Sequence, residues 1–177
     1  MSTTPWGVCI SDRPVAVGIR RVSTSSHGGL ILDADRWEAL ERAMGGPVAA
    51  FAGRPYLEED VDQHLAVLVW PQFFSPLEVW EAVRMFSGTA ETRYQPMLLG
   101  RRYVARPNTL AVAKAQKFTR DHAEDWVVGG MSFNGATGRL LFLRRVGNME
   151  ESVTVQVDDY PELIPIPGAQ VAGMKRI

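Results

Sequence analysis

The helical and β-type patterns of this chain are segregated, and this segregation limits the folds open to it. Segments with helical spacing of apolar residues occupy residues 33–125, whereas β-type segments lie before and after them. The regular alternation of strands and helices that builds a parallel sheet is not seen. The chain has 177 residues, of which 46% are hydrophobic, so it is long enough to bury a core. We therefore expect an α+β fold in a single globular domain spanning residues 1–177.

The β-type segments predict a hairpin near the N-terminus and a meander near the C-terminus. Two short runs, Ile19–Thr24 and Leu30–Leu32, are joined by serines and a glycine pair, which is typical of a hairpin. Turn-like sequences, NGATG and GNME, separate the later runs. The predicted strands of the C-terminal meander are 126–134, 138–147 and 151–163. The tail, 164–177, has two X-Pro steps and no clear periodicity, and we expect it to be extended.

The segment from Ser75 to Phe86 has the clearest helix signal. Ser75 can act as N-cap, Pro76 suits the first helical position, and Glu78 completes a capping box. The residues that we expect on its buried side are Leu77, Trp80 and Met85 or Val83.

Three further segments have helical character. Residues 33–46 begin with the possible caps Asp33 and Asp35 and end with two glycines. The apolar stripe of this segment is formed by Trp37, Leu40 and Met44. Residues 108–126 predict another helix. Residues 55–71 begin acidic and become apolar, which predicts a helix, although the part from Leu65 to Trp70 is also compatible with a strand.

Composition excludes some classes of partner and site. Lys and Arg total 19 and Asp and Glu total 20, so the surface as a whole does not attract nucleic acid or membrane phosphates. The single cysteine, Cys9, excludes an intrachain disulfide and a multi-cysteine zinc site, and we expect it to be a small buried apolar residue. The sequence shows neither a signal peptide nor an apolar run of ~20 residues. We expect a protein of the bacterial cytoplasm that does not bind membranes.

One region combines many polar side chains and is the candidate polar site. Its members are His27, Glu58, Glu59, Asp60, Asp62 and His64, provided that the fold brings His27 to the others. On a helix, Asp60 and His64 would share a face and could orient one another or bind one cation. Acidic residues at a helix start are, however, ordinary capping partners, and this interpretation is favoured over metal binding. We predict no bound metal and no cofactor.

His27 itself has two interpretations. The glycines that follow it could expose its ring in a shaped turn, as a general base or ligand requires. Alternatively, the neighbouring serines and His27 bind the turn backbone and fill the space beneath it, and we favour this second role.

A basic cluster is the second candidate surface. It consists of Arg101, Arg102 and Arg106, with Tyr94 and Tyr103 between or near them. Guanidinium groups and aromatic rings can hold phosphates and stack on bases. Because the overall charge is nearly neutral, nucleic-acid binding is possible but not favoured.

Five stretches of the chain share a pattern with one known family: PWG, GIRRVSTSSHGGLILDADR, YLEEDVDQHLAVLVWP, DHAEDWVV and VQVDDYPEL. On these stretches the chain resembles an uncharacterised domain family encoded by phages and plasmids of proteobacteria and actinobacteria. Members of this family often have a cysteine after Glu-Glu-Asp, where this chain has Val61. The family offers no catalytic residues to carry over. The resemblance implies a small accessory protein of a mobile element, one that blocks a host defence complex.

Two classes of function remain open at this point. The first is an interaction protein that binds a host protein complex, which requires shape and charge complementarity but no catalytic geometry. The second is a small metal-dependent hydrolase or nuclease that uses His27 with the cluster from Glu58 to His64. No strong catalytic motif is seen, so binding is favoured over turnover; the sequence sets no oligomeric state.

Overall fold

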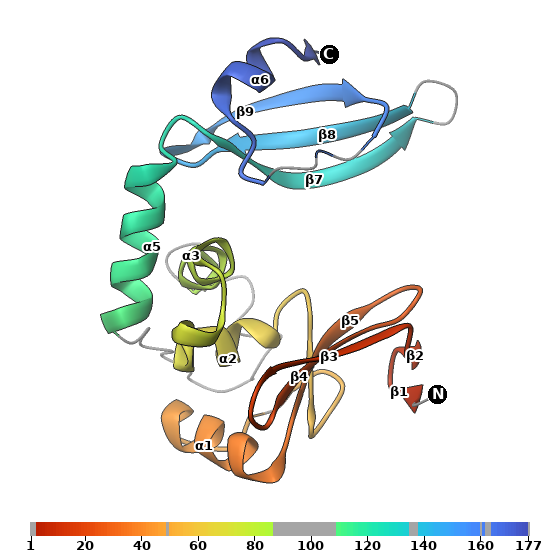
Figure 1. Ribbon diagram of the computed structural model, residues 1–177, viewed down its shortest axis with the longest axis vertical. Helices are drawn as coiled ribbons and strands as arrows, with labels where there is room; N and C mark the ends of the chain where they lie inside the picture. Colours follow the sequence, from red (N-terminus) through yellow and green to blue (C-terminus); the bar gives the residue numbers. More distant parts are fainter. Residues whose placement is uncertain are drawn as a thin grey trace. The chain divides into compact units, whose positions relative to one another are not determined.

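The structure is a computed structural model, which describes residues 3–48, 50–86, 109–134, 138–159, 161 and 164–176. Internal contacts divide the chain into two compact units, unit 1 from Met1 to Ala115 and unit 2 from Gln116 to Ile177. The chain contains both helices and antiparallel sheets, and they do not alternate regularly along it (Figure 1). The predicted α+β class is therefore confirmed. That the whole chain is one domain stays a prediction.

Unit 1 begins with a small hairpin, continues into an antiparallel sheet and ends in helices. Its strands are β1 (Thr3–Thr4), β2 (Gly7–Val8), β3 (Ser11–Ala16), β4 (Ile19–Ser23), β5 (Gly28–Leu32) and β6 (Tyr56–Glu58). Its helical elements are α1 (Ala34–Met44), α2 (Gln63–Val69), the 3-10 helix η1 (Pro71–Phe73) and α3 (Pro76–Met85). Helix α5 (Thr109–Asp121) spans the boundary between the units.

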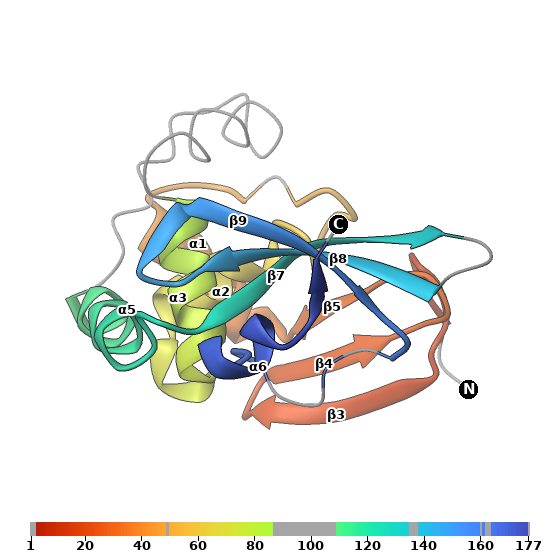
Figure 2. The same ribbon diagram turned by 90° about the horizontal axis from the view of Figure 1, so that it is seen from above.

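The sheet of unit 1 has the order β3-β4-β5-β6, with every neighbouring pair antiparallel. Figure 2 shows β3, β4 and β5 side by side. The predicted hairpin is therefore confirmed as β4 and β5, paired from Ile19↔Leu32 to Ser23↔Gly28. Leu30, Leu32 and Leu57 are almost completely buried and pack with the apolar residues of α1, α2 and α3 in one core.

Helix α1 confirms the predicted caps. The Asp33 side chain accepts a hydrogen bond from the backbone N of Arg36 at 2.8 Å, and Gly45 ends the helix with φ +74°. That left-handed conformation favours glycine. Trp37 and Leu40 are buried, as their spacing predicted.

Helix α2 decides between the two structures that the sequence left open for Leu65–Trp70. The segment is helical to Val69, so the strand alternative is wrong. Leu65 to Leu68 are all buried in the core, and a continuous apolar run of this kind does not by its pattern distinguish a buried helix from a buried strand. The helix begins only at Gln63. Asp60 therefore lies in the preceding turn, and the expected helical pairing of Asp60 with His64 does not form.

Helix α3 has the predicted capping box, with Ser75 and Glu78 bonded to each other's backbone N. Trp80 is buried as predicted. Leu77, Val83 and Met85 are only half-buried, which corrects the predicted face; Val79 and Ala82 are buried instead. The helix thus turns a face centred between Val79 and Ala82 toward the core.

Unit 2 is built around the predicted C-terminal meander. Its elements are β7 (Trp126–Asn134), β8 (Gly138–Arg145), β9 (Asn148–Val157), α6 (Gly168–Ala172) and β10 (Lys175–Arg176). The strands form one antiparallel sheet in the order β10-β9-β8-β7, in which β7, β8 and β9 lie adjacent (Figure 2). Leu141, Leu143 and Val155 form its buried core with Trp126.

The tail is not simply extended, which corrects that expectation. Ile166 and Trp126 exchange two backbone hydrogen bonds, and this bridge places the helix α6 directly after Pro167. Val171 of α6 is buried in the core of unit 2. Burial of this side chain stabilises a short helix, although the apolar residues of the tail show no periodicity and its proline steps predicted an extended segment.

Among the described residues, no helix is long and apolar enough to cross a membrane.

Candidate functional site

A cavity of about 330 Å³ lies in unit 1, beside the turn that leads into β5. We call it the acidic cavity; its lining residues are Trp6, His27, Phe51, Glu58, Asp60, Val61 and Asp62. The structure thus brings the turn at residues 25–29 (SSHGG) next to residues 58–62 (EEDVD), as the candidate site requires. Glu59 lies next to His27, whereas His64 does not line the cavity.

Thr24 fixes the turn that presents His27. The Thr24 hydroxyl donates to the carbonyl O of His27 at 2.9 Å, and the backbone N of His27 donates back to that hydroxyl at 3.2 Å. Ser26 contributes less: its hydroxyl donates to the carbonyl O of Trp6 at 3.5 Å, and its backbone N donates to the Thr24 hydroxyl at 3.3 Å. The His27 side chain is 53% exposed, so it does not fill space beneath the turn. Its ring is presented to the cavity.

The glycine pair after His27 allows close approach of neighbouring groups. Gly29 has φ +155°, and a Cβ there would lie 2.1 Å from the carbonyl O of Leu57 on β6. A Cβ at Gly28 would lie 2.7 Å from Oε2 of Glu59. Glycine at both positions lets β6, and with it the two glutamates, come close to His27.

Glu58 ends β6 and uses only one of its carboxylate oxygens. Oε2 accepts hydrogen bonds from the backbone N of Asp60 at 2.9 Å and of Val61 at 3.3 Å. Oε1 is buried and has no hydrogen-bond partner among the described residues. Burial raises the pKa of Glu58, and the charges of Asp60 and Asp62 act in the same direction, against the two backbone hydrogen bonds.

Asp62 repeats this arrangement deeper in the protein. It occupies the N-cap position of α2 but makes no capping hydrogen bond with its side chain. Its Oδ2 accepts from the backbone N of Phe51 at 2.7 Å, while Oδ1 has no partner in the part of the chain that is described. Only 1% of the residue is exposed, and burial raises the pKa of its carboxyl group. The expected capping role is therefore replaced by a contact with a distant loop.

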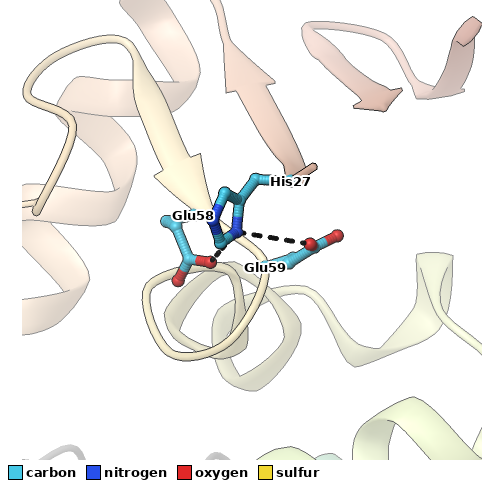
Figure 3. Close-up of side chains that lie close together, drawn as sticks. All are labelled: His27, Glu58 and Glu59. Atoms are coloured by element: carbon cyan, nitrogen blue, oxygen red, sulfur yellow. Dashed lines mark ion pairs between the residues drawn. The ribbon is translucent and has the colours of Figure 1, made fainter. Parts of the chain in front are cut away.

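His27 lies between two carboxylates (Figure 3). Its Nδ1 is 4.0 Å from Oε1 of Glu58 and 3.9 Å from Oε1 of Glu59. One ligand atom from each of the three residues lies within 4.8 Å of the other two. An imidazole nitrogen and two carboxylate oxygens at such separations are a set that can hold a divalent cation.

The other two histidines are placed elsewhere. His64 is buried, its Nδ1 is 3.2 Å from the carbonyl O of Val61, and burial lowers its pKa. His64 is thus a core histidine, and its assignment to the polar site is not supported by its position. His122 lies in unit 2, with Nδ1 2.7 Å from Oδ2 of Asp125 and its ring against Phe118.

Two further expectations have different outcomes. The basic cluster of Arg101, Arg102 and Arg106, with Tyr94 and Tyr103, lies outside the described residues. Cys9 is not a buried apolar residue: it is half-buried, and its Sγ lies 3.0 Å from the carbonyl O of Ser11.

Sequence reasoning missed the two aromatic residues of the cavity, Trp6 and Phe51. The indole Nε1 of Trp6 is buried without an acceptor among the described residues, and its ring contacts Tyr56 edge to face at 5.7 Å. Phe51 is 86% exposed. The only sequence signal for them was the lack of a pattern around them. Each is flanked by alanine, glycine or proline, and neither belongs to a helical or strand periodicity that would place it in the core.

Unit 1 thus combines an antiparallel sheet with a cavity that is lined by acidic and aromatic side chains. The chain belongs to the family of the domain of unknown function DUF7007, whose family model matches residues 1–123. This range includes every residue that lines the acidic cavity. No curated protein and no solved structure matches the chain. The resemblance to an uncharacterised domain family is therefore confirmed.

Proposed function

We propose that this chain acts by binding a protein partner at the acidic cavity. The observation that carries the proposal is Phe51, which is 86% exposed and lines the cavity. An aromatic ring left in water loses the free energy that its burial would supply. Exposed aromatic residues beside a pocket are the residues that most often anchor protein interfaces.

Further apolar residues line the cavity or are exposed in the segment that follows Trp6. Trp6 and Val61 line the cavity with Phe51, and both are half-buried. Val8 and Ile10, which follow Trp6 in the chain, are 56% and 72% exposed. The backbone N of Ile10 donates to the carbonyl O of Ser23, so this segment is held against the strand that leads into the His27 turn. A partner that covers the cavity therefore has apolar side chains to bury.

The charge of the cavity indicates the chemistry of the partner. Asp60 is exposed and lines the cavity with the buried carboxylates of Glu58 and Asp62, whereas none of the described lining residues is Lys or Arg. A partner surface with a basic residue next to an apolar one would complement this arrangement. In our proposal the partner is a host protein complex, and the chain is a phage or plasmid accessory protein that blocks a defence system in the bacterial cytoplasm.

A phage-plating or plasmid-transfer assay in a defended host tests this proposal. Phe51→Asp places a charge in the contact and should abolish protection of the mobile element. The matched control is Val17→Asp, since Val17 is 87% exposed in the turn at the other end of β4. Equal activity of the two variants would contradict binding at the cavity.

The cluster of His27, Glu58 and Glu59 keeps a second candidate function, metal-dependent hydrolysis of a nucleic acid or nucleotide. The two functions differ in their need for turnover. If binding carries the function, the purified wild type should hydrolyse no nucleic acid or nucleotide in the presence of a divalent metal. Metal-dependent turnover by the wild type that is lost in a folded His27→Ala protein would favour the hydrolase, which needs the imidazole.

A further inference from the structure

The separations among His27, Glu58 and Glu59 are those of a ligand set that has not closed around an ion. Nδ1 of His27 is 4.0 Å and 3.9 Å from the two glutamate oxygens, beyond the range of a hydrogen bond. An ion held at about 2.1 Å from each ligand atom places those atoms roughly 3 to 4 Å apart. Movements of the ligand atoms by about 1 Å or less therefore suffice to bring all three within bonding distance of one ion.

The sheet fixes the positions from which the three side chains start. Gly29 pairs with Glu58 across β5 and β6, and the backbone N of Glu59 donates to the carbonyl O of Gly28 at 3.1 Å. His27 directly precedes this pairing. The three side chains thus project from the joined ends of two neighbouring strands, which fix the spacing of their backbones.

A second observation, independent of the clustering, points to a cation. Glu58 is only 9% exposed, its Oε2 is fixed by two backbone N–H groups, and its Oε1, the atom that faces His27, has no hydrogen-bond partner among the described residues. Asp62, 1% exposed, also leaves Oδ1 without a described partner in the wall of the same cavity. Buried carboxylate oxygens without donors are costly unless a cation is bound near them.

We propose that His27 Nδ1 and one carboxylate oxygen each of Glu58 and Glu59 bind a single divalent first-row transition metal ion. The imidazole ligand favours such an ion over Mg²⁺ and Ca²⁺, which prefer oxygen ligands alone, and the two carboxylate ligands suit Mn²⁺ among the first-row ions. Three protein ligands leave coordination positions open toward the cavity, where water or a group from a partner can bind. This site goes beyond the proposed binding function and does not depend on it.

The test uses the full chain, freed of metal by a chelator and titrated with MnCl₂ while the electron paramagnetic resonance signal of free Mn²⁺ is recorded. The wild type should remove one Mn²⁺ per chain from solution. His27→Ala and Glu58→Gln should each weaken this binding by about tenfold or more. Glu58→Gln keeps an oxygen for the two backbone N–H groups, and His27 is half exposed, so both variants are expected to fold.

The control is His122→Ala, because His122 also lies close to a carboxylate, that of Asp125, but does not line the acidic cavity. It should bind Mn²⁺ like the wild type. The proposal is overturned if the wild type binds no Mn²⁺, if His27→Ala binds it unchanged, or if only His122→Ala loses it. Those outcomes leave the Phe51→Asp result in the plating assay untouched, so failure of the metal site and failure of the proposed function are distinguishable.

Discussion

Glu58 and Asp62 each bind the backbone with one carboxylate oxygen and leave the other oxygen without a described hydrogen-bond partner. The first oxygen explains why a side-chain oxygen acceptor is needed for the local structure, since it satisfies backbone N–H groups in a turn or loop. The second oxygen is not needed for that purpose. Two buried, half-satisfied carboxylates in one cavity indicate a site kept for a ligand at a cost in stability.

Trp80 tests the packing of α3. It is 5% exposed, so Trp80→Ala should lower the free energy of unfolding by about 3 to 5 kcal/mol, measured by urea denaturation. Leu77→Ala is the control on the same helix and should cost roughly 1 kcal/mol, because Leu77 is already half in water. Equal losses in the two variants would show that the buried face of α3 is wrongly placed.

Glu78 provides a pH test. Burial raises the pKa of Glu78, but hydrogen bonds from Ser75 and the ion pair with Arg21 outweigh it, and the pKa is lower than its ordinary value of 4.5. A lowered acid pKa stabilises the folded protein above pH 4.5, and this stabilisation is lost as the pH falls through the folded value. Glu78→Gln should therefore be less stable than the wild type at pH 7, by about 1 kcal/mol.

The difference between Glu78→Gln and the wild type should shrink as the pH is lowered below 4.5, measured by urea denaturation at several pH values. Glu38→Gln, an exposed position on α1, should track the wild type at every pH. A Glu78→Gln difference that is constant from pH 7 to pH 3 would contradict an ionic role for this cap.

At the level of elements, the sequence predicted those whose ends carry their own signals. The capping box at Ser75, the cap at Asp33 and the terminating Gly45 lie where the local sequence placed them. The start of α2 and the helix α6 were not predictable, because tertiary contacts determine them. Phe51 binds Asp62 from a distant loop, and Ile166 bridges to Trp126, and neither contact has a local sequence pattern.

The junction of β5 and β6 is the element-scale feature on which the cavity depends. Gly29→Ala should destabilise the protein by about 3 kcal/mol or more, because the added Cβ would lie 2.1 Å from the carbonyl O of Leu57 and φ is +155°. Gly46→Ala, with no heavy atom within 4 Å of its Cβ, should change stability by about 0.5 kcal/mol at most. Thermal or urea denaturation compares them. Tolerance of Gly29→Ala would mean that β6 does not approach β5 this closely.

For the whole molecule, the sequence predicted most of the polar residues of the candidate site and missed the aromatic residues that line the same cavity. The proximity of His27 to Glu58 could be anticipated because polar islands beside apolar strands often meet on a scaffold. Trp6 and Phe51 could not, since aromatic residues usually belong to the core and nothing local marks an exposed one. His64 was grouped with the site by sequence distance, yet its helix buries it in the core.

The charge of the cavity leads to a prediction about association. Asp60→Lys reverses an exposed charge on the cavity wall and should slow association with a basic partner by about tenfold at low salt, with a smaller effect at high salt. Glu38→Lys reverses an exposed charge on α1 and should have little effect. Association rates of both variants, measured by surface plasmon resonance at two ionic strengths, test this difference. Equal effects of the two charge reversals would contradict recognition at the cavity.

The central claim, that this chain works by binding a partner at the acidic cavity, is tested most directly by affinity capture from host lysate followed by binding measurements with the purified partner. Wild type and Val17→Asp should capture the same protein and bind it with equal affinity, and Phe51→Asp should lose it, since Phe51 lines the cavity and Val17 does not. A partner that binds Phe51→Asp as tightly as the wild type would contradict the account.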